Sequence, residues 1–389
     1  MFSLLDALFR KLAAPPAGER LPLRGRAYRC RCGRPVFFRN SRCLACGAEL
    51  GYETAIGEIR SLQKSVVDGL WHLDGIDDPV HAYRRCANFD SPAGCNWLIE
   101  ASDPQTICRS CRLNRTIPDL ADADNRRWWG AIETAKRRLV SQLLGLDLPL
   151  RSKVSEDPER GVAFDLLRSP PEGPRVLTGH ASGLITLNVE EADDAKREKI
   201  RHDLHEPYRT LLGHFRHEIG HYYWDRLIAG TRWHEPFRAL FGDERADYAA
   251  ALRANYEHGP PADWAQRHIS SYASSHPWED WAESWAHYLH VVDSLDTALG
   301  FGLSADDIEV EVEPYKPEDL YAPDDADARR TLTMLNAWLG LTTVLNEVAR
   351  SMGQPDFYPF VMSRPVVTKL HFISLVVRDA RQGVGAERE

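Results

Sequence analysis

The stretch Leu211-Leu-Gly-His-Phe-Arg-His-Glu-Ile-Gly-His-Tyr-Tyr-Trp-Asp-Arg-Leu-Ile228 decides how the rest of the chain is interpreted. Within it, His217, Glu218 and His221 form the pattern His-Glu-x-x-His. Residues four apart lie on one face of a helix, so both imidazoles can reach one metal ion. Glu218 lies beside that face, where its carboxylate can act as a general base on water without binding a zinc ion itself.

A short motif of this kind also arises by chance among the polar residues of ordinary helices. The residues around it favour a buried active-site helix, because they give the segment a substantial apolar side. The apolar residues are Leu211, Leu212, Phe215, Ile219 and Trp224.

Length and charge limit the class of protein. A chain of 389 residues is long enough for two or three domains. Its net charge of -9 argues against a general nucleic-acid binder, although a local basic face is compatible with that charge. There is no run of 18 apolar residues, and the N-terminal stretch is interrupted by charges, so we expect no membrane span and no secretory signal. A cytoplasmic protein is the expectation.

All eight cysteines lie between residues 30 and 111, mostly in closely spaced pairs, which favours metal ligation over a disulfide framework. The first set is Cys30, Cys32, Cys43 and Cys46, in two pairs that are each followed by Gly, as in a zinc ribbon. The second set is Cys86, Cys95, Cys108 and Cys111. Each set predicts one structural Zn²⁺, because four thiolates leave no coordination position open for catalysis. These modules could recruit a protein partner or brace the N-terminal region, and both interpretations stay open.

Periodicity predicts the remaining elements. Helices are expected at residues 2–13, 125–144, 237–256, 330–350 and 366–381, with a further capped start at 304–307. Strands are expected at residues 161–167, 175–178 and 183–189.

A second informative stretch begins at His276-Pro277-Trp-Glu-Asp-Trp-Ala-Glu283. Pro277 suits the first turn of a helix, which places Glu279, Glu283 and His287 along one face. Acidic residues in a first turn also complement the helix dipole, which is a purely structural explanation for them.

Together these residues resemble a known group. The motif followed by Tyr272 and Glu279-Asp-Trp-Ala-Glu283 is similar to the gluzincin pattern of metallopeptidases like anthrax lethal factor. The resemblance implies Glu279 as the third zinc ligand and Tyr272 as a hydroxyl that faces the substrate. The order of ribbon, second Cys set and motifs, over residues 27 to 380, resembles a bacterial family of zinc-binding metallopeptidases. By analogy with zincin-like folds, residues 183–189 would form an edge strand that pairs with the substrate.

The spacing departs from the familiar pattern, because 57 residues separate His221 from Glu279. Glu244, with 22 residues between, comes closer to the thermolysin-type interval and is the alternative ligand. We prefer Glu279 because Tyr272 and the Ala-Glu continuation accompany it. Glu283 would then accept a hydrogen bond from a ligand imidazole. His214, His276, His287 and His290 are interpreted as surface or hydrogen-bonded histidines.

The expected fold is α+β, a mostly helical zincin-like metallopeptidase domain with a small Cys-rich zinc-ribbon region. The expected divisions are 1–26 (helix and linker), 27–52 (zinc ribbon), 53–118 (second four-cysteine module) and 119–389 (catalytic domain). The predicted function is hydrolysis of a peptide or protein substrate, with one catalytic and two structural Zn²⁺. The alternatives are hydrolysis of a non-peptide amide, and a zinc-ribbon module that binds a protein or a nucleic acid and whose motif zinc is structural.

Overall fold

The structure, a computed structural model, describes most of the chain. The described residues are 26–75, 81–203, 206–303, 308 and 313–386. The helix expected at residues 2–13 and the capped start expected at 304–307 lie outside them.

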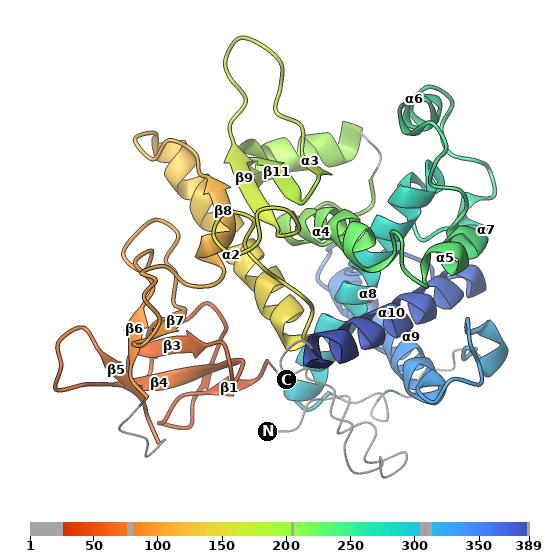
Figure 1. The fold of residues 1–389 in the computed structure, drawn as a ribbon. Coiled ribbons are helices and arrows are strands. Elements are labelled where there is room, and N and C mark those ends of the chain that lie inside the picture. Colours follow the sequence, from red (N-terminus) through yellow and green to blue (C-terminus); the bar gives the residue numbers. More distant parts are fainter. Residues whose placement is uncertain (1–25, 76–80, 204–205, 304–307, 309–312, 387–389) are drawn as a thin grey trace. The chain divides into compact units, whose positions relative to one another are not determined.

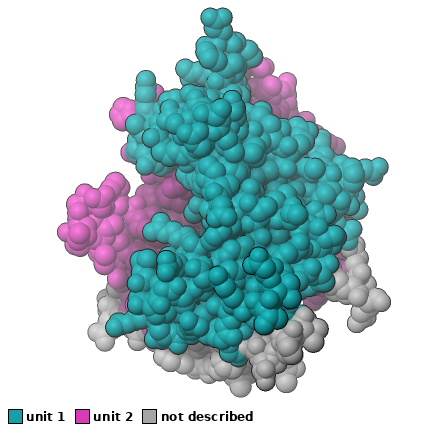
Figure 2. All heavy atoms as spheres, turned by 90° about the vertical axis from the view of Figure 1, so that its left-hand side faces the viewer, with its two compact units in different colours: residues 1–4, 22–146, 150–200 teal, residues 5–21, 147–149, 201–389 magenta. Residues whose placement is uncertain are grey.

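The chain divides into two compact units, which Figure 2 distinguishes by colour. Unit 1 contains the described residues up to 146 together with 150–200, and unit 2 contains 147–149 and the described residues from 201 onward. The domain bounds expected from the sequence stay a prediction, although the bound between residues 52 and 53 falls inside a strand.

Unit 1 holds every strand that the described residues form. A two-stranded antiparallel ribbon pairs Tyr28 with Val36 at the first Cys set. A five-stranded antiparallel sheet in sequential order follows, and its last two strands flank Cys86 and Cys95 in the sequence (Figure 1). These strands are β1 (Tyr28–Arg29), β2 (Pro35–Val36), β3 (Leu50–Glu53), β4 (Glu58–Lys64), β5 (Trp71–Leu73), β6 (Tyr83–Arg85) and β7 (Leu98–Glu100).

A second sheet of unit 1 has four strands in the order β10-β11-β9-β8, in which β9 pairs in parallel with both β8 and β11. The long helix α2 (Ala123–Gly145) packs beside this sheet region, against the 3-10 helix η2 (Val189–Ala192). The strands are β8 (Asn114–Thr116), β9 (Ala163–Leu167), β10 (Gly179–Ala181) and β11 (Leu184–Asn188).

Two strand predictions need correction. The run at 183–189 does form β11, but β11 lies inside its sheet between β10 and β9, so it is not an edge strand. The run at 175–178 is not a strand, and β10 begins only at Gly179. The reason is local: the backbone N–H of Val176 donates to Ser169 Oγ, and its carbonyl accepts from Asn188 Nδ2, so side chains replace ladder hydrogen bonds.

Unit 2 contains helices and no strand among its described residues. Helices α4, α5, α9 and α10 all pack on α8, which runs through their middle (Figure 1). The helices from this part of the chain are α3 (Asp194–Asp203), which begins in unit 1, α4 (Leu211–Leu227), α5 (His234–Phe241), α6 (Tyr248–His258), α7 (Trp264–Arg267), α8 (Pro277–Gly300), α9 (Ala328–Ser351) and α10 (Arg364–Ala386). Short 3-10 helices of unit 2 are η3 (Tyr272–Ser274) and η5 (Pro317–Asp319), whereas η1 (Cys111–Leu113) lies in unit 1.

The helix expected over 237–256 is instead two helices, α5 and α6. Gly242 ends α5 with a φ of 108°, a conformation that favours glycine. Asp247 then caps α6, because its side chain accepts a hydrogen bond from Ala250 N. The prediction missed this break because both pieces have helical periodicity.

Helix α8 begins as its sequence indicates. His276 is the N-cap residue and accepts a hydrogen bond from Trp278 N, and Pro277 occupies the first turn. The indole rings of Trp281 and Trp285 are fully buried along the helix, so α8 forms the core of unit 2.

Helices α4 and α8 approach each other closely at Gly220. A Cβ on Gly220 would lie 3.1 Å from Ala282 Cα and 3.2 Å from Trp285 Cβ. The indole Nε1 of Trp281 donates to the Gly220 carbonyl at 2.9 Å. A glycine inside the His-Glu-x-x-His motif therefore lets the two helices meet.

The combination of helices and sheets agrees with the expected α+β class, whereas a zincin-like fold stays a prediction. None of the described helices is long and apolar enough to cross a membrane.

We predict that Gly220→Ala lowers the stability of the protein. Alanine is the better helix former by about 1 kcal/mol, but overpacking against α8 costs about 1–3 kcal/mol. Gly340→Ala is the matched control, since a Cβ there meets only Ile308 Cγ2, at 3.8 Å, and should leave stability equal or higher. Chemical denaturation of both variants measures the difference, and a Gly220→Ala variant as stable as the control would contradict the packing argument.

Candidate metal and active site

Helix α4 places His217 and His221 one turn apart. Thr210 caps the helix by accepting a hydrogen bond from Gly213 N at 3.0 Å. The two Nε2 atoms of His217 and His221 lie 3.2 Å apart, and His221 is buried. The spacing of four residues therefore brings the imidazoles together as the motif indicates.

Glu279 comes from the first turn of α8 and completes this group. Its carboxylate is 1% exposed, and Oε2 lies 3.0 Å from His217 Nε2 and 3.6 Å from His221 Nε2. The other oxygen, Oε1, accepts a hydrogen bond of 2.5 Å from the Tyr248 hydroxyl. The three residues are the one His-containing group that could hold a metal ion among the described residues.

These side chains fit zinc. Two imidazole nitrogens and one carboxylate oxygen are a usual donor set for a catalytic site, which keeps its fourth position open. Zn–N bonds of about 2.0–2.1 Å in a tetrahedron place neighbouring donor atoms roughly 3.3–3.4 Å apart. The three separations of 3.2, 3.0 and 3.6 Å lie around this value.

Glu218 is buried in the same region of α4 and has no hydrogen bond or ion pair with any other described residue. Burial raises the pKa of its carboxyl group, while the neighbouring His217 and His221 act in the opposite direction. A carboxylate whose pKa is raised is a stronger proton acceptor than an ordinary carboxylate.

Tyr272 lies in η3, and its ring centre is 5.9 Å from that of His217. Burial raises the pKa of its hydroxyl group, and the negative charge of Glu279 adds to that effect. The phenol therefore stays protonated and able to donate a hydrogen bond beside the group.

Glu283 lies one turn after Glu279 on α8 and contacts the outer nitrogen of a candidate ligand. Its Oε1 is 2.7 Å from His217 Nδ1, and its Oε2 accepts a hydrogen bond of 2.6 Å from Ser270 Oγ. A carboxylate on Nδ1 fixes the imidazole so that Nε2 presents its lone pair to a metal. This is the kind of contact that the sequence predicted for Glu283.

Glu244, the alternative ligand, is engaged elsewhere. Its Oε1 lies 2.9 Å from His234 Nε2 and 2.6 Å from Arg238 Nη2. Hydrogen bonding to Arg238 lowers the pKa of Glu244 to about 2, so it is held as a carboxylate in a local ion pair. The structure does not bring it to His217 and His221.

Sequence reasoning missed Tyr248, Ser270 and Trp278. The Trp278 ring lies 4.0 Å from that of His221. Tyr248 and Ser270 reach the group from α6 and from the loop before η3, and neither stands in a recognisable motif. Only Trp278 carried a signal, as part of the aromatic stretch that starts α8.

Three nearby histidines are hydrogen-bonded. His276 caps α8, while His287 Nδ1 lies 2.6 Å from the Tyr358 hydroxyl, and burial lowers the pKa of His287 to about 4. His290 Nδ1 lies 2.6 Å from Arg216 Nη1. The Tyr358 contact shows that the segment between α9 and α10 packs on α8.

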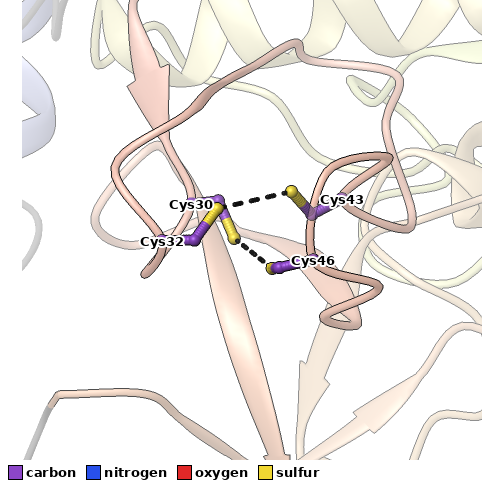
Figure 3. A group of neighbouring side chains, drawn as sticks. All are labelled: Cys30, Cys32, Cys43 and Cys46. Carbon is purple, nitrogen blue, oxygen red and sulfur yellow. Dashed lines mark hydrogen bonds between the residues drawn. The ribbon is translucent and has the colours of Figure 1, made fainter.

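Both Cys sets are assembled in unit 1, and all their sulfur atoms within a set lie within 4.8 Å of one another. Zn–S bonds of about 2.3 Å in a tetrahedron correspond to S···S separations of roughly 3.8 Å. In the first set (Figure 3) Cys30 and Cys46 are 3.5 Å apart, and Cys32 and Cys43 are 3.8 Å apart. In the second set the sulfur atoms of Cys86 and Cys111 are 3.7 Å apart, and those of Cys95 and Cys108 are 3.6 Å apart.

The two Cys sets differ in exposure. Cys32 and Cys46 of the first set are exposed, whereas all four members of the second set are buried. Both sets fit zinc in closed, four-thiolate shells.

Comparison with known proteins agrees with these groups. Residues 125–376 match the family model described as "Putative zinc-binding metallo-peptidase", and residues 27–122 match a zinc-ribbon domain model. The second match covers both Cys sets.

Two relatives share 41% identity with the chain over 347 residues, which is 89% of this chain and 93% of theirs. They are uncharacterized proteins of Mycobacterium tuberculosis (strain ATCC 25618 / H37Rv) and Mycobacterium bovis (strain ATCC BAA-935 / AF2122/97). No solved structure matches the chain.

We predict that Glu279→Ala and Glu244→Ala differ in zinc binding at the His pair. Loss of a direct ligand should weaken zinc there by more than about 100-fold, beyond the 10–100-fold effect typical of outer contacts. Glu244→Ala should keep the zinc. Chelator competition measures both affinities, and the reverse order would move the third ligand to Glu244.

A second prediction concerns the hydroxyl that holds Glu279. Tyr248→Phe removes its 2.5 Å hydrogen bond and should weaken zinc at this site about 10–100-fold. Tyr321→Phe is the control, because Tyr321 also lies in unit 2 but packs on Phe372 and has no hydrogen bond to Glu279. Equal zinc affinity of the two variants, in the same competition assay, would show that Tyr248 has no such role.

Proposed function

Since the chain belongs to the family described as "Putative zinc-binding metallo-peptidase", we propose that it is a zinc-dependent peptidase whose active site is the group in α4 and α8. Membership of this family supports the assignment of a zinc hydrolase. The peptide substrate and the roles of single residues are our proposal. His217, His221 and Glu279 would hold the metal. Zinc on these ligands supplies Lewis acidity toward the scissile carbonyl group.

Glu218 is the proposed general base. Its carboxylate takes a proton from the attacking water and delivers it to the amine that leaves. The raised pKa of the carboxyl group supports both halves of this cycle, since it brings the carboxyl closer to neutral pH.

Tyr272 is the proposed donor to the carbonyl oxygen as negative charge develops there. Its hydroxyl group stays protonated because burial raises its pKa. A positioned donor of this kind stabilises the transition state more than the ground state.

Glu283 and Tyr248 hold the ligands in place rather than act on the substrate. Glu283 accepts a hydrogen bond from His217 Nδ1, and Ser270 orients Glu283 by donating a hydrogen bond to its other oxygen. Tyr248 binds one oxygen of Glu279 and leaves the other directed at the two imidazoles.

The observation that carries the proposal is the state of Glu218. Its side chain is 8% exposed and its oxygens are not among the fully buried polar atoms without a partner, so water can reach a carboxylate that no other described residue binds. A purely structural zinc would need His217, His221 and Glu279 but would have no use for Glu218. A carboxylate that water reaches, and that no other described residue binds, is available to react with substrate and water.

We predict that Glu218→Gln abolishes most peptide cleavage while leaving zinc bound. The substitution keeps the size of the side chain and both imidazoles, and removes a contribution of roughly 10²–10⁴-fold to the rate. Tyr272→Phe should lower turnover by about 10²–10³-fold. Cleavage of a mixed-sequence peptide library, followed by mass spectrometry, is the measurement.

Glu172→Gln, an exposed glutamate in unit 1, is the control for the isosteric change. Zinc content must be equal in all variants before rates are compared. If Glu218→Gln cleaves as fast as the wild type, the assignment of the general base is falsified. If the wild type cleaves no peptide, the substrate class is wrong.

A further inference from the structure

The segment that contains the first Cys set is basic, unlike the rest of the chain. Residues 26–48 contain six arginines and no lysine, aspartate or glutamate. The segment therefore carries +6, and because the whole chain is -9, the remaining residues carry -15. The arginines are Arg26, Arg29, Arg31, Arg34, Arg39 and Arg42.

All of these arginines except Arg26 are exposed. None of the exposed five forms an ion pair with a carboxylate among the described residues. Two of them donate hydrogen bonds within the loops that carry the cysteines, which we call knuckles. Arg29 donates to the Gly33 carbonyl and Arg42 to the Gly47 carbonyl, both at 3.2 Å. Their charges remain available to a partner.

The fold brings together the two loops that carry Arg31 and Arg42. Arg31 stands between Cys30 and Cys32, and Arg42 directly precedes Cys43, so the convergence of the sulfur atoms brings the two loops together (Figure 3). Leu44, at the tip of the second knuckle, is 96% exposed. We call Arg29, Arg31, Arg34, Arg39, Arg42 and Leu44 the knuckle surface.

Neutralising a zinc-thiolate centre does not explain so many arginines. Four thiolates on Zn²⁺ carry a charge of about -2, which two cations would balance. The second Cys set provides an internal comparison. Its segment, residues 86–111, contains one arginine and three acidic residues, so the same donor set is built without a basic excess.

We propose that the knuckle surface binds an acidic, leucine-containing segment of another polypeptide. Arginine is suited to this because its planar guanidinium group binds carboxylates in a bidentate manner. The exposed side chain of Leu44 offers an apolar contact beside the charges, which an acidic segment with apolar residues would bury. This binding does not depend on the proposed peptidase activity.

A protein segment fits better than a nucleic acid for a reason of charge. The chain as a whole carries -9, which disfavours extended contact with a polyanion such as a nucleic acid. A short acidic segment can stay within the basic region. Nucleic acid is therefore the competing outcome of the test.

The test uses the full chain with zinc bound and a fluorescently labelled synthetic peptide of alternating Glu-Glu-Leu units. Arg31, Arg34 and Arg39 are changed together to Gln, because none of their three side chains donates a hydrogen bond to another described residue. The matched control changes Arg175, Arg253 and Arg329 to Gln, three exposed arginines without an ion pair among the described residues. Fluorescence anisotropy gives the dissociation constants at low and physiological salt, and elemental analysis verifies equal zinc content.

We expect the Arg31/Arg34/Arg39 variant to bind the acidic peptide about tenfold or more weakly, the control to bind normally, and the affinity to fall as salt rises. Leu44→Ser should weaken binding at every salt concentration. Equal affinity of the two triple variants, or no binding by the wild type, would overturn the proposal. A single-stranded oligonucleotide of equal charge that binds more tightly than the peptide would replace the protein partner by a nucleic acid.

Discussion

The candidate site depends on the close contact between α4 and α8 at Gly220. Both imidazoles lie on α4 and the carboxylate of Glu279 lies on α8, so the separation of the two helices sets the distance between the donor atoms. A side chain at Gly220 would meet the backbone of Ala282 at 3.1 Å and displace α8. A metal site tolerates little displacement, because ligand distances in such sites vary by only about 0.2 Å.

Buried polar contacts then fix the start of α8, where Glu279 lies. Lys369 of α10 donates to Asp280 Oδ2 at 2.6 Å and to the Arg267 carbonyl at 2.8 Å. Burial raises the pKa of Asp280 to about 6, although the charge of Lys369 acts against this. A buried pair of this kind contributes more to a unique arrangement than to net stability, because desolvation offsets its attraction. We infer that it orients the first turn of α8 beside the site.

Much of the site could be predicted where one local rule governs the geometry. Helical spacing brought His217 to His221, and the Pro277 start placed Glu279 and Glu283 on one face. The pairing of cysteines likewise indicated both four-sulfur sets. Each of these depends on neighbours in sequence, which periodicity and spacing describe.

The features that the sequence did not reveal arise from contacts between distant segments. Tyr248 reaches Glu279 across 31 positions, and no spacing rule connects them. The place of β11 inside its sheet depends on which strands pair, and the strand predicted at 175–178 was wrong because side chains of Ser169 and Asn188 bind that backbone. The roles of Glu218 and Tyr272 are not visible in geometry alone, so they stay predictions.

The central claim is that zinc is held by His217, His221 and Glu279, with a position left open for chemistry. Crystals of the full chain, measured on both sides of the zinc absorption edge, test it directly. We predict an anomalous peak about 2.0–2.2 Å from the two Nε2 atoms and from an oxygen of Glu279, with no fourth protein ligand. A zinc ion with a fourth protein side chain as ligand would contradict the claim. So would the absence of a peak between these three residues while both Cys sets hold zinc.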